Sequence, residues 1–110
     1  MALPRKNRLV KKSDFNKVFK EGKAVKGSFL FIKYRKNELN LPRFGFVVSA
    51  KVAGKAVERN KIRRILSEAV RSKLKNVVGY DIIVFAANKI MIASKEEIAR
   101  DFLMTLDKIQ

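Results

Sequence analysis

The stretch YDIIVFAA, residues 80–87, is a continuous apolar run of strand length. Such a run is typical of a strand covered on both faces, so it predicts the central strand of a sheet. Two other stretches, SFLFIKYRK (28–36) and RFGFVVSA (43–50), are rich in the aromatic and β-branched residues that favour strands. Turn-forming residues in NELNLP, residues 37–42, separate them. These two stretches are therefore expected to pair as antiparallel neighbours.

The strand expected at residues 28–36 has two different faces, because successive side chains point to opposite sides of a strand. One set of alternate positions is apolar throughout: Leu30, Ile32 and Tyr34. The other set changes from aromatic to cationic along the strand: Phe29, Phe31, Lys33 and Arg35. The second face is therefore expected to be partly exposed to solvent.

Three stretches with helical periodicity surround these strands. In the first, Ser13 is a candidate N-cap and Gly22 a candidate stop, which predicts a helix of about two turns. The second helix is expected over residues 58–75, where apolar residues recur with helical spacing. The third begins with Ser94 and Glu97 in the spacing of a capping box.

Together these elements predict one α+β domain over residues 1–110. A brief extra strand at residues 23–26 completes the order α-β-β-β-α-β-α. The expected architecture is a small mixed sheet of about four strands packed with helices. Residues 1–10 are expected to form a flexible basic N-terminus.

The charge of the chain is strongly positive and unevenly distributed. It has 26 Lys and Arg against 10 Asp and Glu, a formal net charge of +16. Residues 1–80 hold 22 basic and 5 acidic side chains, whereas residues 81–110 hold 4 and 5. This excess indicates a polyanionic partner, with nucleic acid as the leading candidate and the first two thirds of the chain as the binding region.

Several classes of protein are excluded by composition. The chain has no cysteine and no histidine, which excludes disulfides and the usual zinc sites. No apolar run approaches the roughly 20 residues that span a bilayer, and the basic N-terminus lacks the apolar core of a signal peptide. A cytoplasmic protein without a membrane segment is expected.

The stretch KVAGKAVERNKIRR, residues 51–64, places several cations at the start of the second helix, where the helix dipole disfavours positive charge. One helical stripe is expected to carry Asn60, Arg64, Ser67 and Arg71, flanked by Arg63, with Arg59 at the apolar border and Lys51 and Lys55 in the preceding loop. A merely solvated face usually mixes charges of both signs, and here only Glu58 and Glu68 interrupt the basic residues. Phosphate groups would neutralise these cations and accept hydrogen bonds from the free N–H groups of the first turn.

Two motifs in this sequence resemble those of the bacterial ribonuclease P protein subunit. The first is a Lys-Ala-Val-x-Arg-Asn-x-x-basic-basic pattern: Lys55, Ala56, Val57, Arg59, Asn60, Arg63 and Arg64. The second lies nearer the N-terminus: Arg8, Leu9, Asp14, Phe15, Val18, Phe19 and Gly22. The resemblance covers nearly the whole chain. One departure is Ala50, where many members of the family carry a second lysine.

The resemblance implies a protein that binds the catalytic RNA of ribonuclease P and helps it to remove the 5′ leader of precursor tRNA. The RNA would perform the hydrolysis, with magnesium ions held by its phosphates and no cofactor held by the protein. The Arg-Asn helix and its preceding loop would face the catalytic RNA. The leader would occupy a cleft lined by Phe15, Phe19, Phe31, Lys33 and Arg35. The implied fold is similar to the second domain of ribosomal protein S5, with a left-handed β-α-β crossover.

Other interpretations remain open at this stage. Phe15 and Phe19 could instead be core residues. A general RNA-binding, ribosomal or DNA-packaging protein fits the charge, whereas an RNA-recognition motif lacks support because RFGFVV misses the expected glycine and the element order differs. A stand-alone nuclease lacks clustered carboxylates, because the acidic residues of the basic region are single: Asp14, Glu21, Glu38, Glu58 and Glu68. Weak self-association without RNA is left open by the sequence.

Overall fold

The computed structural model describes residues 3–109 and confirms the predicted order of elements. The helices are α1 (Lys12–Glu21), α2 (Ala56–Arg71) and α3 (Lys95–Leu106), with short 3-10 turns η1 (Arg5–Asn7), η2 (Leu74–Val77) and η3 (Asn88–Ile92). The strands are β1 (Lys23–Lys26), β2 (Leu30–Lys36), β3 (Arg43–Val47) and β4 (Tyr80–Ala86). Among the described residues, no helix is both long enough and apolar enough to cross a membrane.

The four strands form one mixed sheet in the order β1-β2-β4-β3. Strand β4 is central, as its apolar sequence predicts, and it runs antiparallel to β2 and parallel to β3. The predicted antiparallel pairing of residues 28–36 with 43–50 is therefore wrong. The loop after β2 crosses the start of β4, where Asn37 N–H donates to Gly79 O at 2.9 Å and Gly79 N–H to Leu41 O at 3.3 Å. This crossing leaves room for β4 between the two strands.

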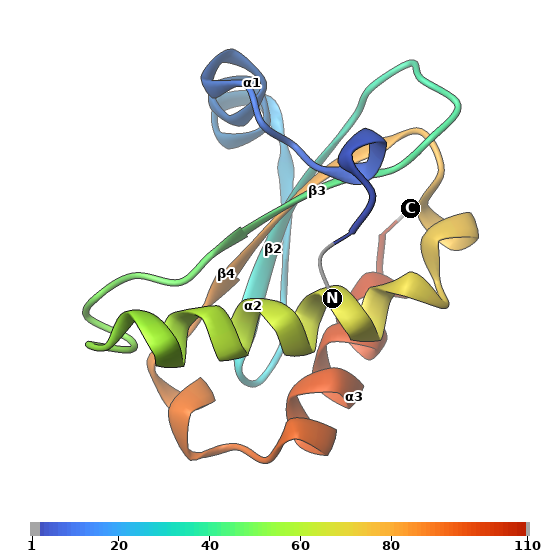
Figure 1. The fold of residues 1–110 in the computed structure, drawn as a ribbon. Coiled ribbons are helices and arrows are strands. Elements are labelled where there is room, and N and C mark those ends of the chain that lie inside the picture. The colour runs from blue at the N-terminus through green and yellow to red at the C-terminus, as the bar shows by residue number, and fades with distance from the viewer. Residues whose placement is uncertain (1–2, 110) are drawn as a thin grey trace.

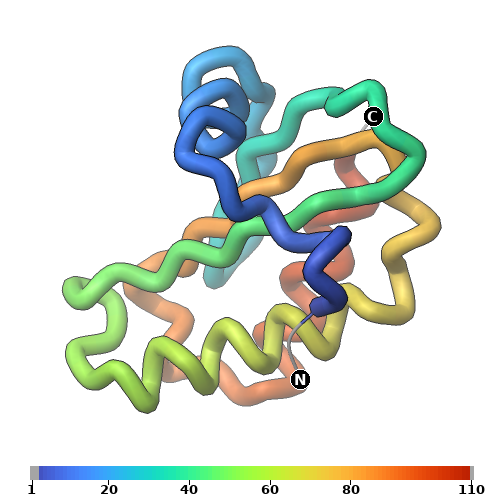
Figure 2. Tube along the Cα trace, turned by 45° about the horizontal axis from the view of Figure 1, so that its top comes forward, coloured from blue at the N-terminus to red at the C-terminus, as the bar shows by residue number. Residues whose placement is uncertain are grey.

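The connection from β3 through α2 to β4 is left-handed, as the family resemblance implied. Figures 1 and 2 both place β3 nearer the viewer than β4, with α2 below the sheet and the two strands running in the same direction. Viewed from the start of β3 toward its end, the chain moves counter-clockwise from β3 through α2 to β4. Most parallel connections turn the other way, so general rules alone would have given the wrong hand.

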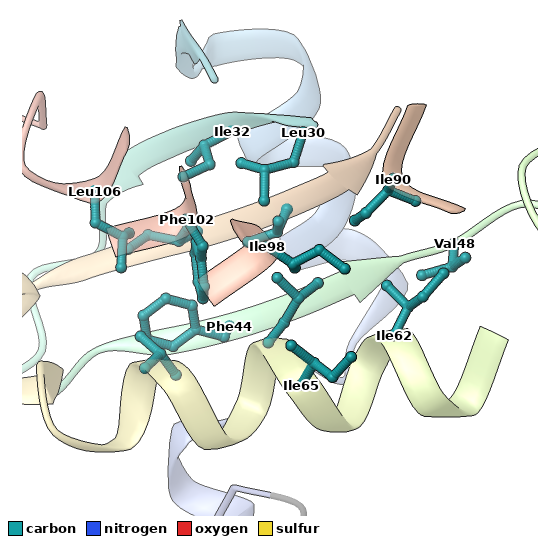
Figure 3. Close-up of a cluster of buried hydrophobic side chains, with 14 of the residues drawn as sticks. Leu30, Ile32, Phe44, Val48, Ile62, Ile65, Ile90, Ile98, Phe102 and Leu106 are labelled. Carbon is teal, nitrogen blue, oxygen red and sulfur yellow. The ribbon is translucent and has the colours of Figure 1, made fainter. Parts of the chain in front are cut away.

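Helices α2 and α3 cover one face of the sheet, and α1 lies on the other (Figures 1 and 2). The main core lies between the sheet and the helix pair, where Ile32, Phe44 and Phe102 are fully buried (Figure 3). A smaller cluster under α1 contains Leu9, Val18 and Ile83, with Phe15 and Phe85 packed against it. Helix α1 is short, and Phe31, Lys33, Arg35 and Phe85 stay half-buried on its side of the sheet. This face, which we call the open face, is therefore only partly covered.

Two helix boundaries differ from the prediction. Helix α1 begins at Lys12, so Ser13 lies inside the helix instead of capping it. Helix α2 runs from Ala56 to Arg71, which is earlier at both ends than expected. At α3 the predicted capping box is confirmed, because Ser94 Oγ accepts from Glu97 N–H at 3.1 Å and Glu97 Oε1 accepts from Ser94 N–H at 2.8 Å.

The N-terminal segment, residues 3–10, is packed against the fold, unlike the flexible segment expected from its charge. Leu3 and Leu9 are buried, and Leu9 N–H donates to Phe44 O at 2.8 Å. Asn7 is also buried and donates from Nδ2 to Pro42 O at 2.8 Å. Apolar residues between the charges therefore fix this segment beside β3. Residues 1 and 2 lie outside the described residues.

Candidate nucleic-acid interface

The open face of the sheet carries a cluster of aromatic rings. Phe31 of β2 and Phe85 of β4 are paired across the strands, and their rings stack at 4.7 Å between centroids with an interplanar angle of 6°. Phe19 of α1 meets Phe85 at 6.3 Å and 59°. Three elements distant in sequence thus bring their rings together under α1. We refer to Phe19, Phe31 and Phe85 as the aromatic cluster.

Phe85 was not among the residues predicted for this site. Its strand is a continuous apolar run, which gave no sign that one face becomes partly exposed near its end. Strand alternation does place Phe85 on the same face as Ile83. Only the register of β4 with β2, which pairs Phe85 with Phe31, identifies that face as the open one.

Phe19 is an exposed ring and not a core residue, since 56% of its surface is accessible. Lys33 of β2 lies over it, with Nζ 4.1 Å from the ring centroid, and the same Nζ donates to Phe19 O at 3.1 Å. A cation held over an aromatic face is a favourable contact. The structure therefore brings together Phe19, Phe31 and Lys33 of the predicted cleft.

Phe15 combines packing with a place on the same face. It is half-buried and packs against Leu9, Val18 and Ile83. Its ring lies directly over Gly45 of β3, where an added Cβ would be 2.5 Å from Phe15 Cζ. The absence of a side chain at Gly45 is what lets this ring approach the strand so closely. Both interpretations of Phe15, core packing and cleft lining, are thus compatible with its position.

The arginines of the open face are held by carboxylates. Arg35, a predicted cleft residue, has its Nε 3.2 Å from Oε1 of Glu21, at the far end of α1. Arg43 grips Asp81 with two nitrogens, Nε at 2.8 Å and Nη2 at 2.6 Å, and its Nη1 lies 3.3 Å from Oδ2 of Asp14. The hydrogen bond to Asp81, opposed by burial and aided by both carboxylate charges, raises the pKa of Arg43. These guanidinium charges are largely compensated within the protein.

The outer side of α2 and its preceding loop also carry cations, and most of these are exposed to solvent. The exposed members of the predicted set are Lys51, Lys55, Asn60, Arg64 and Arg71. Arg59 is half-buried and donates from Nη1 to Ala53 O at 2.9 Å and Gly54 O at 3.0 Å. It therefore ties the loop to the helix through neutral acceptors.

Arg63 and Ser67 differ from the exposed stripe that the helical spacing predicted. Arg63 is half-buried and donates from Nη1 to Asn60 Oδ1 at 2.9 Å. Ser67 is buried, and its Oγ donates to Arg63 O at 2.8 Å. The packed N-terminal segment is the reason, because it lies beside this part of α2, and sequence reasoning had left that segment free.

A groove of about 290 Å³ separates the N-terminal segment from α2. Its lining includes Arg8, Leu9, Phe15, Phe46, Arg63 and Ser67. Two guanidinium groups thus border a partly aromatic groove, and none of the described residues that line it is acidic. Phe15 lines this groove and packs against the small core under α1. Phe85 of the aromatic cluster packs against the same core, so the two sites are neighbours. Arg8 is a second residue for which the sequence alone suggested no place in the site.

The chemistry available at these surfaces is recognition of a polyanion with unpaired bases. Exposed rings can stack on bases, and exposed arginines can bind phosphates. Within residues 3–109, no three His, Cys, Asp or Glu side chains gather closely enough to hold a metal ion. The donor set of the described chain therefore does not fit a bound magnesium ion.

Comparisons with known proteins give consistent matches. The family model described as Ribonuclease P matches residues 3–110. A ribonuclease P protein component from Alkaliphilus oremlandii is 42% identical over 104 residues, covering 94% of this chain and 90% of that protein. Another, from Thermotoga maritima, is 38% identical over 96% of this chain and 87% of that protein.

Solved structures agree with the sequence matches. A mutant of the Staphylococcus aureus ribonuclease P protein with defective mRNA degradation activity superposes with a TM-score of 0.88, at 28% identity over 94% of this chain and 87% of that one. The Thermotoga maritima protein in complex with 1-(4-fluorophenyl)-2-thiourea gives a TM-score of 0.85, at 31% identity over 94% of this chain and all of that one.

Proposed function

This chain belongs to the family of bacterial ribonuclease P protein components, and from that premise we propose that it binds two parts of its RNA partners with two separate surfaces. The family role is maturation of the 5′ end of precursor tRNA by an endoribonuclease holoenzyme of which this chain is the protein component. Association with the ribonuclease P RNA and with precursor tRNA follows from that role. The division of labour between the surfaces is our proposal.

The outer side of α2 with its preceding loop is the surface for the catalytic RNA. Its polar set is Lys51, Lys55, Arg59, Asn60, Arg63, Arg64, Ser67 and Arg71, with Ser67 acting from the groove floor. Arginine forks suit phosphate oxygens, and Asn60 can both donate and accept at a 2′-hydroxyl or base edge. In this proposal the RNA carries the hydrolytic chemistry and the magnesium ions, as the family resemblance implies.

The open face under α1 is the surface for the leader of precursor tRNA. Exposed rings accept any base by stacking, and a nearby cation follows the backbone, which suits a single strand of variable sequence. The supporting observation is the exposed ring of Phe19 beside the Phe31–Phe85 stack, with Lys33 over it. Phe15 and Arg35 form the two ends of this surface. We also propose a cytoplasmic location, as the family role in bacterial tRNA maturation implies.

The test is Phe19→Ala in the holoenzyme reconstituted with a bacterial catalytic RNA. Loss of one stacking platform should weaken binding of precursor tRNA by roughly 1–3 kcal/mol. Binding of mature tRNA, which has no leader, should stay the same, because Phe19 is exposed and contributes little to the core. Titration of the holoenzyme with precursor tRNA and with mature tRNA gives the two affinities.

Ile92→Ala is the matched control, because Ile92 is 85% exposed on η3, outside the proposed surface. It should change neither affinity. An equal loss for precursor and mature tRNA in Phe19→Ala would indicate damage to the fold and contradict the leader assignment, as would no loss at all.

A further inference from the structure

Helix α1 is tied to the sheet by one ion pair near each end. Near its start, Oδ2 of Asp14 lies 3.3 Å from Nη1 of Arg43. At its last residue, Oε1 of Glu21 lies 3.2 Å from Nε of Arg35. The two pairs look alike by distance, but they differ in burial. The side chains of Asp14 and Arg43 are 19% and 22% exposed, whereas those of Glu21 and Arg35 are 60% and 35% exposed.

The Arg43 guanidinium is oriented by Asp81, independently of its contact with Asp14. Arg43 and Asp81 are paired residues of β3 and β4, and Arg43 holds the buried Asp81 carboxylate with two nitrogens. Asn37 also donates to Asp81 Oδ1, from Nδ2 at 2.9 Å. Bidentate pairing sets the plane of the guanidinium, so its remaining nitrogen has one direction in which to donate. Asp14 of α1 lies in that direction.

The pair at the other end cannot fix α1 in the same way. Exposed ion pairs are screened by water and must order two long side chains, so they contribute little. The Arg35 guanidinium also donates from Nη1 to the carbonyl oxygen of the next residue, Lys36, at 3.4 Å, so Glu21 is not its only acceptor. Of the two ion pairs, the contact from Asp14 to Arg43 is therefore the better defined. Lys33 of β2 also donates from Nζ to Phe19 O of α1, at 3.1 Å.

We infer that Asp14 is a positioning residue for leader binding, which sets the place of Phe19 above the sheet through its contact with Arg43. The inference rests on the proposed function of the open face. Phe19 follows Asp14 by five positions on a rigid helix of 10 residues. A tilt at the start of so short a helix displaces the ring that must lie beside Phe85 and under Lys33. Asp14 itself touches no RNA in this arrangement.

Asp14→Ala and Glu21→Ala form a matched pair for the test. Each removes one carboxylate from α1, and each brings the same reduction of negative charge near the RNA. If charge alone matters, both variants should bind every RNA ligand slightly more tightly. If Asp14 positions Phe19, the two variants should change leader binding in opposite directions.

The experiment measures binding of precursor tRNA and mature tRNA to the holoenzyme reconstituted with each variant. Asp14→Ala should lower the affinity for the precursor about fivefold to tenfold, a part of what loss of one stacked base costs. Its affinity for mature tRNA should not fall. Glu21→Ala should lower neither. Asp14→Glu, which restores a carboxylate within reach of Arg43, should recover most of the preference for the precursor.

Two outcomes would overturn the inference. One is unchanged or tighter precursor binding in Asp14→Ala, and the other is an equal loss for precursor and mature tRNA, which would mean general damage to the fold. Circular dichroism of each variant gives the helix content independently. Phe19→Ala in the same series separates the two proposals. If it also spares precursor binding, the leader surface itself is wrong, and if it alone weakens binding, only the role of Asp14 fails.

Discussion

The cations on the open face of the sheet and those on the outer side of α2 differ in what compensates them. On the open face, Arg35 and Arg43 meet carboxylates, and Lys33 lies over a ring. On α2, Arg59 and Arg63 donate to carbonyl and amide oxygens, which carry no net charge. The total charge of the chain hides this difference. It supports the proposal that α2 binds phosphates and that the open face binds mainly bases.

The starts of α2 and α3 show the same contrast. At α3, hydrogen bonds from Ser94 lower the pKa of Glu97, and the capping box satisfies the first turn within the chain. The corresponding residue of α2 is Lys55, whose side chain has no acceptor. Glu58 Oε1 is 3.4 Å from Lys55 N, a long contact. The first turn of α2 is therefore capped less completely than that of α3, which supports the proposal that an external anion binds there beside the arginines.

The largest expected effect comes from removing a compensated arginine. Arg43→Ala leaves the buried Asp81 carboxylate without its charged partner, and breaking such a pair costs about 3 kcal/mol in the free energy of unfolding. Denaturant unfolding of the free protein measures this value. A loss below about 0.5 kcal/mol, the range of ordinary surface substitutions, would contradict the idea that the open-face charges are bound internally.

A smaller effect is expected from the aromatic cluster. Phe85→Ala removes the ring that contacts both Phe31 and Phe19, so precursor tRNA should bind more weakly by roughly 1–3 kcal/mol. The dependence of this affinity on salt should not change, because no phosphate contact is lost. Titrations at several salt concentrations measure both quantities. A flatter salt dependence in Phe85→Ala would mean that the open face binds mainly phosphates.

The sequence predicted those features of the fold and the site that depend on residues close together in the chain. The capping box at Ser94, the central place of β4 and the buried face of β2 follow from patterns within a few residues, and all three are confirmed. The neighbours of β4 and the exposure of Phe85 depend on strand register between distant segments, so local patterns gave the wrong pairing for β3 and missed the ring.

The N-terminal segment shows a second limit of local reasoning. Its charge suggested a flexible tail, whereas Leu3 and Leu9 are buried in the fold. That packing makes the segment one wall of the groove that Ser67 also lines, and it brings Arg8 there beside Arg63, which helical spacing alone could not show. The motif Arg8–Leu9 did indicate that this segment packs against the fold, because an apolar residue next to a cation fits a segment with one buried side.

The smallest expected effect comes from a single exposed arginine of α2. Arg64 is exposed on α2, and Arg100 is an exposed arginine of α3, so substituting each by alanine removes the same charge from different sides of the molecule. Arg64→Ala should reduce the slope of log affinity for the catalytic RNA against log salt by about 0.7–0.9, the share of one phosphate contact, and Arg100→Ala should leave it unchanged. Such a slope change amounts to about threefold in relative affinity between 50 and 200 mM salt. Equal slopes in the two variants would mean that the net charge of the chain, and not the α2 surface, attracts the RNA.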